Sequence, residues 1–145
     1  MMALLGVICI AALPGCFSAL PEEEASTLTI KDSGEEETVA LTPAEKAAQI
    51  AAEFYRVREI EKAIENYQNA INLDPEYVDA YLGLGWIYLR ETEEYQKALD
   101  TFLPARDLAP DDPYARTSLA YAYSVVQDYQ AAVNEYVEAI ALASE

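Results

Sequence analysis

The sequence predicts an all-α protein built from three antiparallel helical hairpins that stack into a short solenoid. An order of Ala, aromatic, Ala and Pro recurs at a spacing of 34 or 35 residues in the second half of the chain. A small residue followed three places later by an aromatic precedes each of these sets at the same spacing. A period of this length corresponds to one helix–turn–helix unit. The recurring positions are Ala63, Tyr67, Ala70 and Pro75; Ala98, Phe102, Ala105 and Pro110; and Ala132, Tyr136 and Ala139.

The first hairpin has a clear start signal, Thr42-Pro43-Ala44-Glu45. Thr42 can cap the first helix, and Pro43 suits the first helical position because its missing N–H is not needed there. Glu45 can complete a capping box by reaching back to the backbone of Thr42. We therefore expect the first helix to begin at Pro43.

Small residues and aromatics alternate, which allows neighbouring helices to nest. Positions 51, 85 and 120 are Ala, Gly and Ala, so two helix backbones can approach closely there. The aromatics one turn later, Phe54, Tyr88 and Tyr123, would fill the wedge between hairpins. Gly83 and Gly85 lie inside one of these helices, where we expect close helix packing and not a phosphate-binding loop.

Prolines and one inserted residue mark the ends of the helices. Pro75 and Pro110 lack a backbone N–H and disfavour helix before them, so each should end one helix. A new helix follows at once. The spacing is one residue longer across the 90–94 stretch, where a turn is expected to absorb the extra residue.

This order of residues resembles the tetratricopeptide repeat from about Thr42 to the C-terminus. The resemblance implies a right-handed solenoid with a first hairpin turn that favours glycine, whereas this chain has Arg58 and Glu59 there. Arg116 stands where a large aromatic is usual. Either the third repeat packs more loosely, or Arg116 pairs with a carboxylate. The implied repeats cover about 44–77, 78–112 and 113–145.

Composition indicates a solvated helical domain joined to a flexible acidic segment. The formal net charge is −17 and histidine is absent, so electrostatics oppose nucleic acid and anionic lipid as partners. Residues 22–37 hold seven acids against Lys31 alone, and 16–41 is therefore expected to be a disordered linker. Within it, Thr27 to Ile30 is interpreted as coil, with a transient strand as the alternative.

The N-terminal segment resembles a bacterial lipoprotein signal peptide. Residues 1–12 are apolar apart from Cys9 and lead into a Leu-Pro-Gly motif that ends at Cys16. The resemblance implies that 1–15 is removed and that lipid on Cys16 anchors the protein in a membrane. Phe17 after the cysteine is similar to outer-membrane lipoproteins that face the periplasm. The alternatives are a cleaved signal without lipid, an uncleaved anchor, and an apolar helix in a cytosolic protein.

The sequence contains no recognisable constellation for catalysis or metal binding. Zero histidines remove His-based acid–base chemistry and the commonest zinc ligand, and no Ser or Cys sits in a nucleophile elbow. The acidic clusters at 91–94 and 111–112 are expected at turns and helix starts, where the helix dipole favours acids. We therefore expect a non-enzymatic protein with no cofactor and no metal.

The resemblance places a binding groove on the concave face, lined by the first helix of each hairpin. The residues expected there are Tyr55, Arg56, Leu82, Trp86, Leu89, Arg90, Thr117 and Tyr121. Relatives that grip a terminal carboxylate use Lys and Asn at positions where this chain has neither, so that specificity is not implied. In a competing interpretation, Trp86 simply packs against Tyr121. The two arginines would then be neutralised by Glu53 and Glu91.

These observations predict a membrane-tethered scaffold that binds a protein or peptide segment in bacterial cell-envelope assembly. The alternative is an accessory protein of an envelope transporter that binds a small apolar ligand. An open trough favours the peptide, and an enclosed cavity favours the ligand. A second candidate surface is the apolar flank of the last helix, from Tyr136 to Leu142. Self-association or another protein would cover it, unless the end tolerates exposure.

Overall fold

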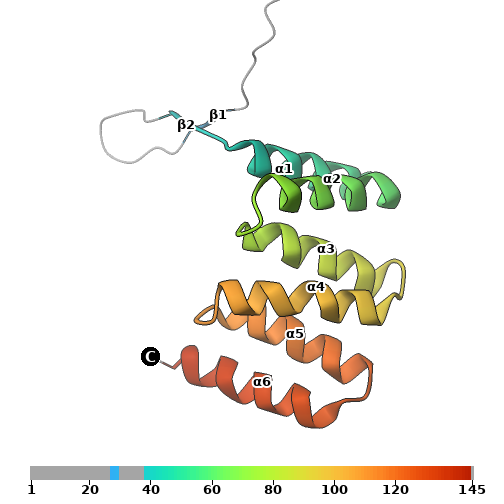
Figure 1. The fold of residues 1–145 in the computed structure, drawn as a ribbon, viewed down its shortest axis with the longest axis vertical. Helices are drawn as coiled ribbons and strands as arrows, with labels where there is room; N and C mark the ends of the chain where they lie inside the picture. Colours follow the sequence, from blue (N-terminus) through green and yellow to red (C-terminus); the bar gives the residue numbers. More distant parts are fainter. Residues whose placement is uncertain (1–26, 30–37, 145) are drawn as a thin grey trace, which may run out of the picture.

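The computed structural model describes residues 27–29 and 38–144, and this part of the chain forms six helices and two short strands. The helices run in a stack from α1 at one end to α6 at the other (Figure 1). Contacts join each hairpin internally and join α2 to α3 and α4 to α5 between hairpins. The predicted all-α array of three hairpins is therefore confirmed. The helices are α1 (Pro43–Arg56), α2 (Ile60–Leu73), α3 (Val78–Arg90), α4 (Tyr95–Leu108), α5 (Pro113–Val125) and α6 (Tyr129–Leu142).

The start of α1 is the predicted capping box. The Thr42 hydroxyl accepts a hydrogen bond from the Glu45 backbone N–H at 3.2 Å. The Glu45 carboxylate accepts one from the Thr42 backbone N–H at 2.7 Å. Two N–H groups that the helix itself leaves without partners are thereby satisfied, which fixes the first helical residue at Pro43.

The turns inside the hairpins share one backbone geometry. Three residues separate α1 from α2 and α5 from α6, whereas four separate α3 from α4, so the inserted residue lies where the spacing predicted it. Arg58, Glu93 and Gln127 occupy equivalent turn positions, and all have positive φ angles of 66°, 55° and 65°. This left-handed conformation suits glycine, which explains why the resembled family favours glycine there.

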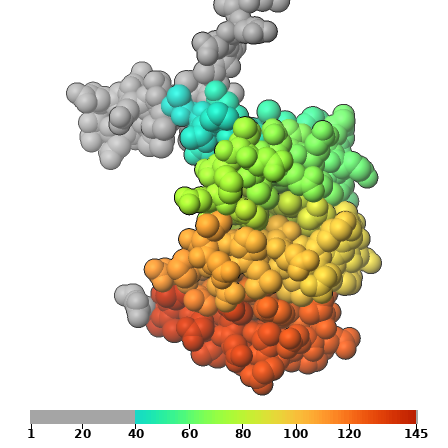
Figure 2. All heavy atoms as spheres, viewed as in Figure 1, coloured from blue at the N-terminus to red at the C-terminus, as the bar shows by residue number. Residues whose placement is uncertain are grey.

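The helices approach one another at small residues. Ala51 and Ala120 are fully buried, and Gly85 packs against the ring of Phe102, which is also fully buried. A Cβ on Gly85 would lie 2.5 Å from Cε1 of Phe102, closer than real contacts allow. The close packing expected at this glycine is confirmed. Figure 2 shows that side chains close the spaces between hairpins, so the helices form one continuous body.

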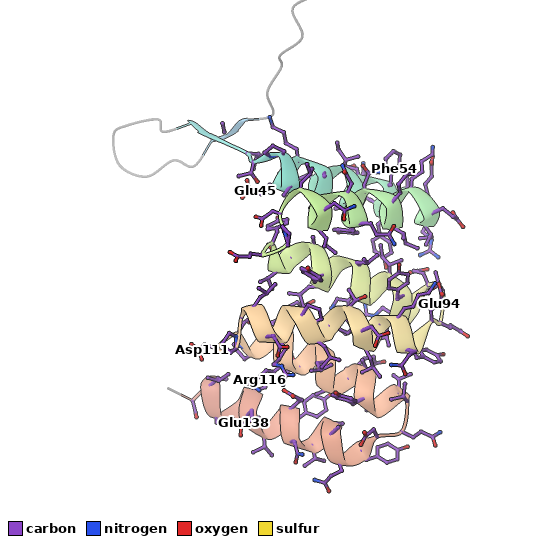
Figure 3. All side chains as sticks on the ribbon, viewed as in Figure 1. Glu45, Phe54, Glu94, Asp111, Arg116 and Glu138 are labelled. Carbon is purple, nitrogen blue, oxygen red and sulfur yellow. The ribbon has the colours of Figure 1, made fainter. Side chains whose placement is uncertain are left out.

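Arg116 is held by a carboxylate, which confirms one of the two readings of its position. Its Nη1 lies 3.1 Å from Glu135 of α6, and its Nε donates to the carbonyl of Pro110 at 2.9 Å. Arg106 binds the other oxygen of Glu135 at 2.8 Å. All three side chains are mostly buried, and Figure 3 shows Arg116 on α5 beside α6. An ionic cluster thus joins the last two hairpins where an aromatic would otherwise pack.

The segment before α1 contains a strand pair where coil was favoured. β1 (Thr27–Thr29) pairs antiparallel with β2 (Thr38–Ala40), with Thr27 opposite Ala40. The strand alternative for Thr27 to Ile30 was the correct one for Thr27–Thr29, because Thr and Val favour extended backbone once a partner strand is available. The rest of the predicted signal peptide and acidic linker lies outside the described residues.

Among the described elements, the strands contact each other and no helix, so the core is built from helix–helix packing alone. The helices from Pro43 to Leu142 therefore form this core without help from the strands. Within 27–29 and 38–144, none of the helices is both long and apolar enough to cross a membrane.

Candidate functional site

A groove of about 300 Å³ crosses the first two hairpins and reaches the start of the third. We call it the aromatic groove, and it is partly open to solvent. Its residues come from α1, α2, α3 and α5, so the stacking of hairpins assembles it. The lining residues are Tyr55, Tyr67, Gly83, Trp86, Ile87, Arg90 and Tyr114.

Trp86 forms the floor of the aromatic groove and also touches the core. Its ring meets Phe102 edge to face with centroids 5.5 Å apart, and it lies 5.6 Å from the ring of Tyr121. Its Nε1 is buried and has no hydrogen-bond partner among the described residues. The edge of the indole that carries the N–H is therefore covered by protein. Both readings of Trp86 are thus partly right, because it packs against Tyr121 and also lines the groove.

Arg90 supplies the positive charge of the aromatic groove. Its guanidinium lies over the Trp86 ring, 4.3 Å from the centroid, which is cation–π geometry. Arg90 is exposed and forms no ion pair with any residue that the structure describes. Glu91 forms its ion pair with Arg58 and its hydrogen bond with Tyr55, while the charge of Arg90 acts on it without direct contact and helps to lower its pKa.

Arg56, the other arginine expected in the groove, lies outside the groove lining. It binds Glu53 at 2.7 Å, as the competing interpretation held, and its side chain is 73% exposed. Arg56 and Arg90 occupy the same position in successive repeats, but Arg56 pairs with Glu53 whereas Arg90 stacks on Trp86. This makes Arg56 a natural control for Arg90.

A polar cluster closes the α1 side of the aromatic groove. The Tyr55 hydroxyl donates to Oε1 of Glu91 at 2.9 Å, and Arg58 pairs with Oε2 of the same carboxylate at 3.0 Å. The hydrogen bond from Tyr55 holds the pKa of Glu91 below its usual value, with help from Arg58. The same bond raises the pKa of Tyr55. Tyr55 therefore stays a neutral donor with a fixed ring position at the edge of the groove.

Tyr67 and Gly83 line the aromatic groove side by side. A Cβ on Gly83 would lie 2.5 Å from Cζ of Tyr67, so the missing side chain makes room for the Tyr67 ring. Burial raises the pKa of Tyr67. Sequence reasoning assigned both residues to packing alone, since Tyr67 lies on the second helix of its hairpin.

Besides Arg56, four residues expected in the groove are not among those that line it: Leu82, Leu89, Thr117 and Tyr121. Leu82 and Leu89 are each only 5% exposed and belong to the core, because α3 is enclosed by neighbours on both sides. Thr117 uses its hydroxyl to bond the Pro113 carbonyl of its own helix at 2.9 Å and does not line the groove. Tyr121 is 44% exposed and extends the apolar surface next to Trp86.

Tyr114 was missed by sequence reasoning although it is 54% exposed and lines the aromatic groove. It stands in the first turn of α5, directly after Pro113, where the chain enters the third hairpin. Its position depends on the stacking of the third hairpin on the first two, which no local signal reveals.

Among the described residues, no cluster of three acidic or sulfur side chains is placed to hold a metal ion.

Comparison with known proteins shows which repeat family part of the chain resembles. A family model described as TPR repeat matches residues 53–91. This stretch contains the end of α1 and all of α2 and α3. Over 84 residues, 58% of this chain, the sequence is 34% identical to Superkiller protein 3 of Schizosaccharomyces pombe. Over 92 residues, 63% of this chain, it is 29% identical to Tetratricopeptide repeat protein 37 of Xenopus laevis. The chain spans only 6% of the length of each of these relatives.

Solved structures agree with this class. The crystal structure of MamA superposes with a TM-score of 0.66 at 27% identity, covering 70% of this chain and 58% of that one. A chain of the CopN-Scc3 complex superposes at 0.63 with 19% identity, covering 68% of this chain and 58% of that one, which shows the fold alone. Residues 53–91 thus match the tetratricopeptide-repeat model, and the six helices share the helical solenoid fold of these structures.

Proposed function

We propose that this protein is a scaffold that binds a peptide segment of a partner protein in the aromatic groove. The observation that carries the proposal is the exposed guanidinium of Arg90, stacked on Trp86 and without an ion pair among the described residues. In a chain with a net charge of −17, a cation that forms no direct ion pair among the described residues and lies beside an aromatic surface is a place where an acid from outside fits.

The lining predicts the chemistry of the bound segment. The rings of Tyr55, Trp86 and Tyr114 offer apolar contact area, and Arg90 offers a donor for one carboxylate. We therefore expect an apolar or aromatic residue next to Asp or Glu. Aromatic and arginine side chains are the residue types that dominate binding energy at interfaces.

The shape of the groove favours a peptide over a small molecule. It is partly open, and its volume of about 300 Å³ lies at the lower end of the range for small-ligand pockets. A peptide can lie across an open groove and make further contacts outside it, whereas a small apolar ligand binds best when protein encloses it.

Selection from a random peptide library on residues 42–145 tests this proposal. We expect the selected peptides to combine an acidic residue with a neighbouring apolar one, and to lose binding to Arg90→Glu. Arg56→Glu is the matched control, because the same change one repeat earlier lies outside the groove. Peptides that bind both variants equally, or a selection that enriches no acid, would contradict the proposed site. Selection of no peptide, together with binding of small apolar probes, would favour the transporter-accessory alternative.

We further propose that lipid on Cys16 tethers the helical domain to a bacterial membrane, most simply the outer membrane on its periplasmic side. Support comes from the sequence alone: the apolar 1–12 stretch, the Gly15-Cys16 pair and Phe17. Residues 17–41 would then separate the domain from the headgroups and leave the aromatic groove free for a partner in envelope assembly.

Replacement of Cys16 by Ser tests the tether. We expect the variant to lose metabolic labelling with palmitate and to move from the membrane to the soluble fraction, while Cys9→Ser keeps both properties. A Cys16→Ser protein that remains in the membrane with an intact N-terminus would show an uncleaved anchor instead. Cleavage without labelling in the unmodified protein would show an ordinary secretory signal.

A further inference from the structure

The outer face of α6 carries an apolar stripe that the described chain leaves open. Val133, Val137 and Ile140 are 55%, 57% and 69% exposed, and their spacing of four and three residues places them on one side of the helix. This stripe, which we call the α6 ridge, lies at one end of the stack (Figure 1). It extends the apolar flank that the sequence predicted at this helix.

Most of the equivalent positions in the earlier hairpins are covered by the next hairpin. Counting back by the repeat, Val133 corresponds to Leu99 of α4 and Ile64 of α2, and both pack into the main core. Val137 corresponds to Leu103, which packs against the same core, and to Gln68 of α2, which is exposed. The following hairpin thus covers the position of Val133 in both earlier hairpins and that of Val137 in the middle one. The α6 ridge is therefore a stacking face of the repeat that lacks its neighbour among the described residues.

The opposite end of the stack has the matching deficit. Ile50 on α1 is 48% exposed, whereas its equivalents Leu84 and Leu119 are 5% and 0% exposed because the preceding hairpin covers them. A hollow of about 610 Å³ lies on this face of α1. We call it the α1 hollow, and Figure 3 shows Phe54, one of its residues, at this end of the stack. The α1 hollow is lined by Gln49, Ile50, Ala52, Glu53, Phe54 and Val57.

We propose that copies of this protein associate end to end, with the α6 ridge of one copy seated in the α1 hollow of the next. The contact would repeat between chains the packing of α2 on α3 and of α4 on α5 within the chain. A second copy fits because each end presents the surface that the other end lacks.

The charge distribution agrees with a second copy as the occupant. Although the chain carries a net charge of −17, α1 has two acids and two bases and is neutral as a helix. On α6 the only acids are Glu135, which Arg106 and Arg116 hold, and Glu138. With Glu135 held by two arginines, Glu138 is the acid of α6 that has no ion pair among the described residues, so one end helix is neutral and the other carries one uncompensated charge. Salt should screen the remaining repulsion and strengthen the association.

The geometry also decides between two kinds of dimer. A symmetric contact of one α6 ridge with another would leave the α1 hollow open in both copies. A ridge-in-hollow contact is head to tail, so it leaves one free end at each side and can continue into longer assemblies.

Sedimentation velocity of residues 42–145 over a range of protein concentrations tests the proposal. We expect the unmodified domain to sediment faster as concentration rises, and more so at higher salt. Val137→Glu and Ile50→Glu should each remain monomeric alone. Mixed together they should form a one-to-one dimer that grows no further, because each variant keeps one intact end. Leu108→Glu, at an exposed position of α4 in the middle hairpin, is the control and should behave like the unmodified domain.

Two outcomes would overturn the proposal. An unmodified domain that stays monomeric at every concentration and salt would show that the ends do not associate. Dimerisation of Ile50→Glu alone would show a symmetric contact between α6 ridges. Circular dichroism of each variant checks that the helices are intact. Because Arg90 lies in neither end face, Arg90→Glu should associate normally, so this result is separate from the outcome for the aromatic groove.

Discussion

Replacing the two glycines of α3 by alanine should have opposite effects on the free energy of unfolding. At Gly85 the new methyl would lie 2.5 Å from Cε1 of Phe102 and 2.8 Å from two further ring atoms. Phe102 is fully buried and cannot move without disturbing the core. Such overpacking costs about 1 to 3 kcal/mol, against a gain of about 1 kcal/mol from the better helix propensity of alanine. We therefore expect Gly85→Ala to lose up to about 2 kcal/mol.

At Gly83 the obstructing group is the far end of a side chain. The new methyl would meet Cζ of Tyr67 at 2.5 Å and its hydroxyl at 2.8 Å, and this end of the ring lies in the aromatic groove. The ring can swing towards the open groove, so the gain in helix propensity of about 1 kcal/mol should remain. Gly83→Ala should thus keep or raise stability while it fills the groove and weakens peptide binding.

Urea unfolding followed by circular dichroism, together with binding of a selected peptide, separates these effects. The reasoning predicts loss of stability for Gly85→Ala and loss of binding with an intact fold for Gly83→Ala. Equal destabilisation by both changes would refute it, because Tyr67 would then be as fixed as Phe102 and the groove would not be open.

Three further predictions follow from single residues. Thermal unfolding should show that Trp86→Phe keeps the stability of the protein, because phenylalanine retains ring packing and removes a buried N–H without a partner. Trp86→Ala should lose less stability than the roughly 3 to 5 kcal/mol that truncation of a fully buried tryptophan costs. Gln127→Gly should raise the unfolding free energy by about 1 kcal/mol, because it relieves the positive φ at this turn. Glu138→Gly, at an exposed position in the interior of α6, should instead lower the unfolding free energy by about 1 kcal/mol. The folded pKa of Glu91 is depressed, so the contribution of this carboxylate to stability is present above the unfolded pKa of 4.5 and is lost as pH falls through the folded pKa. An NMR titration of Glu91 should show the depressed pKa, and Tyr55→Phe should raise it.

Local sequence signals predicted the helices because each signal acts within one or two turns. The capping box at Thr42 and Glu45 satisfies backbone groups of its own helix, so the start of α1 needed no tertiary information. The inserted residue between α3 and α4 was predictable because repeat spacing counts residues directly. Gly85 was predictable because only a residue without a side chain suits so close an approach.

The groove was only partly predictable because its lining depends on how hairpins are rotated on one another. Trp86 and Arg90 were found from their register on α3, but Leu82 on the same register turned inward to the core. Tyr67 and Tyr114 come from other positions of their hairpins, and stacking alone brings them to Trp86. The partner of Arg116 was also undecided, because Glu135 reaches it only through the packing of α5 on α6.

The central claim is that a partner segment binds over Trp86, and Trp86 is the only tryptophan of the chain. Its fluorescence therefore reports on the aromatic groove directly. Titration of residues 42–145 with a selected peptide should change the emission in a saturable way, equally for Arg56→Glu. The same titration should need about tenfold more peptide for Arg90→Glu, which corresponds to about 1.4 kcal/mol. Calorimetric binding of the peptide without any change in Trp86 emission would show that the groove is not the binding site.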